Sequence, residues 1–331
     1  MATEKIGMTG IAFRKLGVVI GLALFSVVVQ AQSFPTRPVR FILQFPAGLG
    51  PDVVMRDVAE KLTKQWGQPV IVDNKPGASG IIALDAARRG SPDGHDIVCA
   101  DMGALAVNRA IYKTVPYNVE RDFEPVISVF NAPYFVIVNA SLPVKTLKDF
   151  IEYAKANTGK LSYGSIGLGN PTHLSAEAFK QAYGLDMTHV PFKEIGSLVV
   201  AGGSGDISMM TLSTVSAAAG LQTGRLKVLA VGTRKRLGSY PDIPTIEEAG
   251  GTFVEAGAWV GCLAVKGTPP QVIAKINRDM DAIVKSTDFQ KRLFTMGFQA
   301  TGGTPADLTK LIKSDGERLG GLVQKLNIKL D

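Results

Sequence analysis

An apolar stretch followed by a glycine loop and a helical pattern recurs along this chain, and the recurrence constrains the fold more than any other feature. The first example runs from residues 39–44 through the loop 45–52 into a helix with one apolar face. The same unit returns at residues 69–89 and 95–112, with helices expected at 81–89 and 104–112. Strands that alternate with helices pair in parallel, so the pattern predicts an α/β fold.

A second series of the same kind follows an interruption at Asn131-Ala132-Pro133, and 331 residues exceed the usual single core. A short helix is expected to start at residues 241–245, and the apolar strand at 259–265 is expected to return to the first series. Three terminal helices, at 270–284, 287–296 and 305–325, are expected to cover that series. We therefore predict two lobes with a ligand cleft between them, each a mostly parallel sheet flanked by helices. The expected parts are a signal peptide at 1–31, lobe 1 at 32–131 and 255–331, and lobe 2 at 132–254.

The N-terminal segment has the pattern of a secretory signal peptide. Arg14 and Lys15 precede an apolar run at 16–29, and small residues before Gln32 offer a cleavage site. The run is shorter than the roughly 20 residues that span a bilayer. Removing three basic residues and one acidic residue lowers the formal charge from +7 to +5. We expect an exported, monomeric protein, and the dispersed charge disfavours nucleic-acid binding.

The loop at residues 45–52 has the features of an anion-binding loop. Pro46 ends the strand, Gly48 and Gly50 permit positive φ, and Pro51 with Asp52 suits a first helical turn. Free amides there would favour a carboxylate, although glycine could equally make an ordinary tight turn. Comparable loops at 77–80, 101–103 and 165–173 should lie at the carboxyl ends of strands, where ligands bind in open α/β sheets.

The chain lacks the common cofactor and catalytic patterns. Val53 and Thr172 stand where a dinucleotide loop has its third glycine, and a nucleophile elbow, a P-loop and metal-ligand spacing are all missing. We therefore predict no cofactor, no metal and no catalytic residue. An exported hydrolase-like enzyme stays open as an alternative, with Ser79, Ser165 and His173 as its only candidate residues.

Some single residues have two interpretations. We expect Asp52 and Asp206 to order loops, although either could accept from a ligand. His95 and His189 are expected to be structural, and His173 to contact a ligand or order its loop. Both cysteines lie in apolar strands; export permits a disulfide, but free buried thiols are favoured here.

The ordered motifs along nearly the whole mature chain resemble those of the Bug-type receptors, the periplasmic substrate-binding proteins of tripartite tricarboxylate transporters. The motifs that carry the resemblance are Pro38-Val39-Arg40, Phe45-Pro46-Ala47-Gly48, Gln68-Pro69-Val70, Asn74-Lys75-Pro76-Gly77-Ala78, Pro92-Asp93-Gly94, Ser165-Ile166-Gly167-Leu168-Gly169 with His173, Val190-Pro191-Phe192-Lys193, Gly224-Arg225-Leu226, Pro241-Asp242-Ile243-Pro244-Thr245 and Gly267-Thr268-Pro269-Pro270.

This resemblance implies a type II periplasmic binding fold without catalytic activity that closes on a small organic carboxylate, such as a di- or tricarboxylate, an amino acid or an aromatic acid. It implies membrane permease subunits as partners, and a sensor protein is an alternative partner. The predicted ligand-binding residues are Ala47, Gly48, Leu49, Gly50, Asp52, Ser79, Ser165, Gly167, Gly169, Asn170, Thr172, His173 and Asp206.

The chain departs from the family pattern at four places. Leu49 replaces a usual glycine, Ile81 a common polar residue, Asn170-Pro171 a serine or threonine pair, and Glu194-Ile195-Gly196 the usual glycine pair after the lysine. The first three changes indicate a more apolar pocket. Glu194 would repel a carboxylate, so it is expected to point away or to pair with an amino group of the ligand.

Overall fold

Two β-sheets organise the computed structural model of the chain, which describes residues 34–330. The predicted signal peptide at 1–31 lies outside the described residues. Residues 37–331 form one unit and hold both sheets. No helix among residues 34–330 is both long and apolar enough to cross a membrane.

The first sheet has the strand order β11-β4-β10-β3-β1-β2. β1 lies between β2 and β3 and is parallel to both, whereas β10 runs antiparallel to β3 and β4. Its strands are β1 (Val39–Leu43), β2 (Val70–Asn74), β3 (Asp96–Asp101), β4 (Phe123–Pro133), β10 (Gly257–Val265) and β11 (Gln299–Gly302).

The second sheet has the order β7-β6-β8-β5-β9. β6 is parallel to β7 and β8, and β5 is antiparallel to β8 and β9. Its strands are β5 (Phe135–Asn139), β6 (Leu161–Ser165), β7 (Met187–Pro191), β8 (Met209–Leu212) and β9 (Leu226–Val231).

Both sheets are therefore mixed, whereas the sequence predicted mostly parallel ones. The strand-loop-helix units β1–β3 and β6–β8 are parallel as expected. The antiparallel partners are the strands that carry the chain between the sheets. The chain leaves the first sheet at Pro133, enters the second at Phe135, and returns at Gly257. A strand that arrives from the other sheet is antiparallel to its neighbours, as β5 is to β8 and β10 is to β3.

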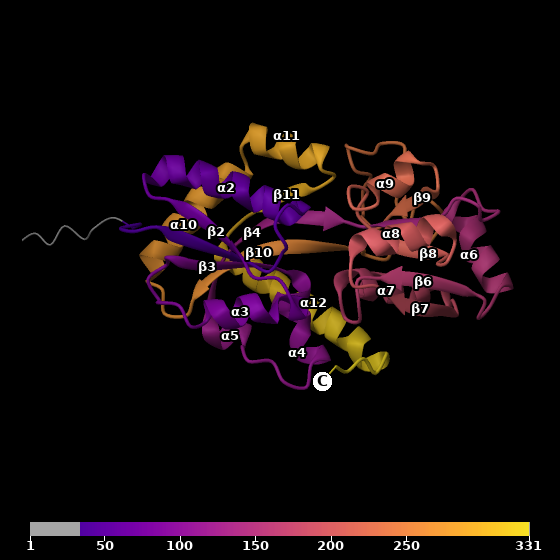
Figure 1. Cartoon of the computed structure of the whole chain (residues 1–331), viewed down its shortest axis with the longest axis horizontal. Helices are drawn as coiled ribbons and strands as arrows, with labels where there is room; N and C mark the ends of the chain where they lie inside the picture. Colours follow the sequence, from indigo (N-terminus) through magenta and orange to yellow (C-terminus); the bar gives the residue numbers. More distant parts are fainter. Residues whose placement is uncertain (1–33, 331) are drawn as a thin grey trace, which may run out of the picture. The chain divides into compact units, whose positions relative to one another are not determined.

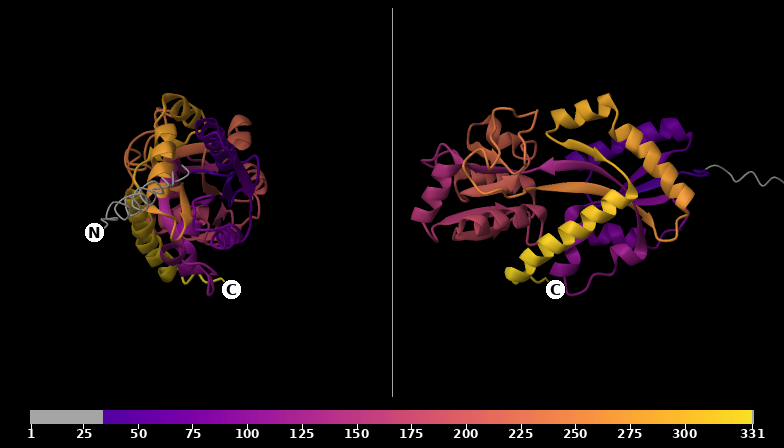
Figure 2. Two further views of the ribbon diagram at one scale, coloured as in Figure 1. Left: turned by 90° about the vertical axis from the view of Figure 1, so that its left-hand side faces the viewer. Right: turned by 180° about the vertical axis from the view of Figure 1, so that it is seen from behind.

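Helices cover both faces of the first sheet. In Figure 1, α2, α10 and α11 lie on one side of it and α3, α5 and α12 on the other. The right-hand view of Figure 2 shows α12, in yellow, running obliquely from this sheet, and α12 also contacts α7 of the second sheet. These helices are α2 (Gly50–Trp66), α3 (Ile81–Ala87), α4 (Asn108–Ile111), α5 (Val119–Asp122), α10 (Pro270–Val284), α11 (Thr287–Thr295) and α12 (Pro305–Lys325).

The helices around the second sheet belong to two apolar clusters. The α6 and α7 side is centred on Phe150, Tyr163 and Phe179, and the α8 and α9 side on Phe135 and Leu198. The bounds of these helices are α6 (Leu147–Ala156), α7 (Pro171–Tyr183), α8 (Ile195–Ser204) and α9 (Ala218–Gln222).

Some predicted elements differ from the structure. The helix expected at 104–112 is a π-helical turn, Gly103–Val107, followed by the short α4. The short helix expected after Pro241 is a series of turns, because Thr245 instead forms a bridge with Val231. β11 was not predicted, and its alternating, half-exposed residues carry no apolar run.

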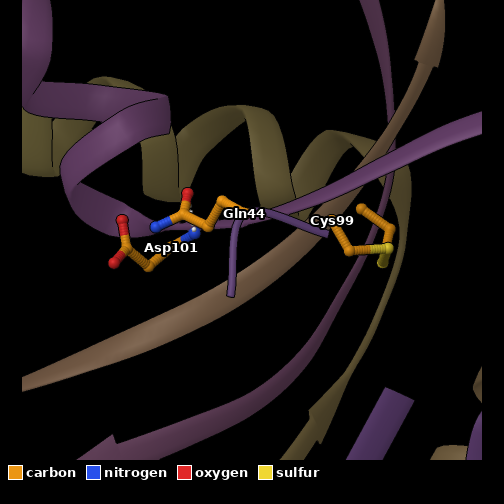
Figure 3. Close-up of a disulfide and its surroundings, with 4 residues drawn as sticks. Gln44, Cys99 and Asp101 are labelled. Carbon is orange, nitrogen blue, oxygen red and sulfur yellow. Dashed lines mark hydrogen bonds between the residues drawn. A yellow bond between two sulfur atoms is a disulfide. The ribbon is translucent and has the colours of Figure 1, made fainter. Parts of the chain in front are cut away.

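Cys99 and Cys262 form a disulfide, so the prediction of free thiols is wrong. The two residues are direct register partners in the antiparallel pair β3 and β10, with Cα atoms 4.1 Å apart. Figure 3 shows the bridge beside the end of β1. Register between strands 163 residues apart brings the sulfurs together, and the spacing of the cysteines in the sequence does not reveal that register.

Candidate functional site

The buried side chain of Asp52 holds the loop between β1 and α2 in place by hydrogen bonds. Its buried carboxylate accepts the backbone N–H of Gly48 at 2.8 Å, Arg56 Nε at 2.9 Å and Asn74 Nδ2 at 2.8 Å. Burial acts to raise the pKa of Asp52, but these three hydrogen bonds outweigh it and lower the pKa below its usual value. Asp52 is thus an ionised residue that orders the loop.

The two glycines of this loop have different tasks. Gly48 has φ of +83°, and an added Cβ would meet no atom within 4 Å. Gly50 does not have the positive φ that the sequence predicted. It is the first residue of α2, and an added Cβ would lie 3.0 Å from the ring of Phe298. Gly48 therefore allows a backbone conformation with positive φ, and Gly50 leaves room for the ring of Phe298.

Gln44 joins three loops of the first sheet at the carboxyl ends of β1 and β3. It directly precedes the 45–52 loop, and its Oε1 accepts the backbone N–H of Asp101 at 3.1 Å. The same oxygen would lie 2.5 Å from a Cβ on Gly80, in the loop at 77–80. Sequence reasoning missed Gln44, although its place directly after an apolar strand was a usable signal.

The loop after β6 is held together by its own side chains. Asn170 caps α7 by accepting the backbone N–H of Thr172 at 3.1 Å, and the Thr172 hydroxyl accepts the N–H of Ile166 at 2.9 Å. Gly167 and Gly169 have φ of +90° and +73°. The side chains of Asn170 and Thr172 thus fix the course of the backbone.

His173 also orders this loop. Its Nδ1 accepts the N–H of Gly169 at 3.2 Å, which places the proton of the neutral ring on Nε2. Burial, together with the nearby His189, lowers the pKa of His173 to about 4. His173 is therefore neutral at pH 7, and of its two expected roles the loop-ordering one matches this contact.

Ser165 and His189 form a hydrogen bond of 2.7 Å between Oγ and Nε2. This pair resembles a nucleophile and its base, but Ser165 is fully buried and also contacts the carbonyl of Gly167 at 3.2 Å. His189 stacks on Tyr163, whose hydroxyl binds Glu177. The pair belongs to the packed interior of the second lobe.

The loops of the two sheets approach each other at Gly103 and Pro171. An added Cβ on Gly103 would lie 3.2 Å from Asp101 Oδ1 and 3.4 Å from Pro171 Cδ. Ile111 packs against Gly169, which has no side chain to block it. The structure therefore brings the loops at 101–103 and 165–173 together.

Several backbone N–H groups in the two glycine loops have no acceptor among the described residues. Among them are those of Ala47, Leu49, Gly167 and Leu168. Leu49 and Leu168 also expose apolar side chains, at 40% and 42%. Each lobe thus offers free amide donors beside an exposed leucine, an arrangement that suits an anion with an apolar body.

Two other predicted site residues differ from this arrangement. Asp206 lies apart from the two glycine loops, and the Ser79 hydroxyl is already hydrogen-bonded within the protein. Asp206 is exposed and accepts from Ser204 at 2.7 Å. It precedes β8, so it lies at the edge of the second sheet opposite Ser165. Ser79 lies in the loop at 77–80, where its hydroxyl accepts from Tyr112 at 3.0 Å.

A hollow of about 350 Å³ lies beside the links between the sheets. Residues of α7, α12 and the returning chain line it, among them Ser175, Arg318 and Trp259. None of the predicted site residues lines this hollow, but Met102 of the loop at 101–103 does, so the hollow borders the loop cluster on that side.

Comparison with known proteins shows the family of this chain. Residues 54–328 match the model of the tripartite tricarboxylate transporter family receptor, TctC. This chain belongs to that receptor family. Its members are periplasmic binding receptors and not enzymes, so the hydrolase-like alternative is wrong and the Bug-type resemblance is confirmed.

Individual TctC relatives are similar over nearly their whole length. Protein BugT of Bordetella pertussis is 29% identical over 95% of this chain and 97% of its own. The structure of R. palustris Rpa4515 with adipate is 31% identical, with a TM-score of 0.81, covering 90% of this chain and all of that one. MatC of Rhodopseudomonas palustris, with bound malate, is 28% identical, with a TM-score of 0.76, covering 88% and 100%.

Proposed function

We propose that this TctC receptor is exported through an N-terminal signal peptide and captures a small organic carboxylate between the loops at 45–52 and 165–173. The free amides of Ala47, Leu49, Gly167 and Leu168 carry the proposal, because each sheet has a set of unused donors in a glycine loop at the carboxyl end of a strand. The adipate and malate bound by two relatives support this ligand class.

Binding between the loops favours closure of the lobes. A carboxylate that contacts both loops stabilises only the closed arrangement, so the ligand shifts the population toward it. The closed receptor then presents its ligand to the permease subunits of a tripartite tricarboxylate transporter. Export agrees with the disulfide, since such bonds persist outside the cytoplasm.

A thermal-shift screen of the mature chain against mono-, di- and tricarboxylates, amino acids and aromatic acids tests this function. A ligand at 100 times its dissociation constant stabilises the folded state by about 2.7 kcal/mol, which raises the melting temperature measurably. The absence of a shift with every acid in the panel would contradict the proposal. Product analysis of the same mixtures should show unchanged acid.

A further inference from the structure

Asp101 stands where the loops of the two sheets meet. It is the last residue of β3, and the carboxyl end of β3 lies at the same sheet edge as the loop at 45–52. Figure 3 shows its side chain pointing away from the disulfide, with Gln44 between them. Its Oδ1 also lies close to the point where Gly103 approaches Pro171 of the second lobe.

No Lys, Arg or His among residues 34–330 comes within salt-bridge distance of the Asp101 carboxyl group. The other inward-facing acids differ in this respect: Asp52 pairs with Arg56 at 2.9 Å and Asp315 with Arg318 at 2.6 Å. Desolvation raises the pKa of Asp101 above its ordinary value. The protein thus places an acid without a countercharge at the loop cluster.

The capping role of Asp101 does not account for its charge. Oδ1 accepts the N–H of Ala104 at 3.1 Å at the start of the π-helical turn. Asparagine or serine would supply the same acceptor, because a cap requires an oxygen but not a negative charge. A second carboxylate on the ligand would be repelled here, whereas an ammonium would gain a charge-assisted hydrogen bond.

We propose that the ligand is an amino-bearing carboxylic acid whose ammonium group binds Asp101 while its carboxylate binds the loop amides. The inference rests on the proposed function and narrows its ligand class. Tyr134, which links the two sheets, lies in the electrostatic field of Asp101, and burial and then that field raise the pKa of Tyr134.

Isothermal titration with matched pairs tests the inference: aspartate against malate, leucine against 4-methylpentanoate, and 5-aminopentanoate against adipate. The amino member of at least one pair should bind about 10- to 100-fold more tightly, as a hydrogen bond to a charged group provides. Asp101→Asn keeps the cap on Ala104 and should remove that preference. Asp186→Asn, an exposed change at the opposite edge of the second sheet, should leave it unchanged.

Two results would overturn the inference while the proposed function stands. One is tighter binding of the member without an amine in all three pairs, which would indicate a protonated Asp101 that donates to the ligand. The other is an affinity of Asp101→Asn for the amine within twofold of the wild-type value. Failure of every acid to bind would instead refute the proposed function, and the inference with it. Melting of the unliganded variants checks that each one folds.

Discussion

The side-chain oxygen of Gln44 accepts the backbone N–H of Asp101 at 3.1 Å, and this one hydrogen bond joins the loops that follow β1 and β3. The same oxygen packs against Gly80, so a third loop rests on it. The carboxyl edge of the first sheet therefore acts as one connected surface.

Replacing Gln44 by leucine should weaken ligand binding and destabilise the fold by about 1–3 kcal/mol, because the N–H of Asp101 loses its acceptor. Chemical denaturation and titration with a carboxylate found in the screen measure the two effects. Gln65→Leu, an exposed change on α2, is the matched control. Equal stability and affinity for both variants would show that the loops do not depend on Gln44.

Gly48→Ala should abolish or strongly weaken carboxylate binding while the chain stays folded. The added Cβ meets open space, so the folding cost is only that of a positive φ, about 1–2 kcal/mol. Gly67→Ala is a close control, because Gly67 also has positive φ and open space but caps the far end of α2. Similar melting temperatures with different affinities are expected, and wild-type affinity for Gly48→Ala would argue against this loop as the site.

Removal of the disulfide by the double change Cys99→Ala and Cys262→Ala should lower the free energy of unfolding by about 2–4 kcal/mol, because the bridge closes a long loop in the unfolded chain. Denaturant titrations with and without reductant measure the loss. Reductant should destabilise the wild type and leave the double variant unchanged. A wild type that is insensitive to reductant during unfolding would contradict the expectation.

The folded state should become less stable as the pH is lowered, because His173 is held neutral in it. Its folded pKa of about 4 lies below the unfolded value of about 6.5, so the unfolded state binds the proton more readily between these values. The contribution is complete above pH 6.5, decreases as pH falls toward 4, and is smaller by roughly 2 kcal/mol at pH 5. His173→Gln should show a shallower decrease than the wild type over this window, and parallel curves would refute the assignment.

The sequence predicted those parts of the fold that depend on local signals. The helices at 270–284 and 305–325 begin and end where expected, because proline and capping residues mark their first turns. The role of Asp52 also followed from its place in a first helical turn. These features need only neighbouring residues for their explanation.

The features that the sequence did not predict depend on strand register or on contacts across the chain. The disulfide requires β10 to align Cys262 with Cys99, and Gln44 gains its role only when β1 lies beside β3. The half-exposed β11 forms a strand only because it pairs with β4 in the first sheet. Asp101 had no pattern that set it apart from a turn residue.

The two links between the sheets begin and end side by side. Pro133 and Gly257 are register partners, and the N–H of Tyr134 donates to the carbonyl of Ala256 at 3.0 Å. The second lobe is thus one uninterrupted length of chain inserted at a single point of the first. This insertion should allow the second lobe to be exchanged between relatives as a single segment, and the exchange would transfer the half of the proposed binding site that lies in the loop at 165–173.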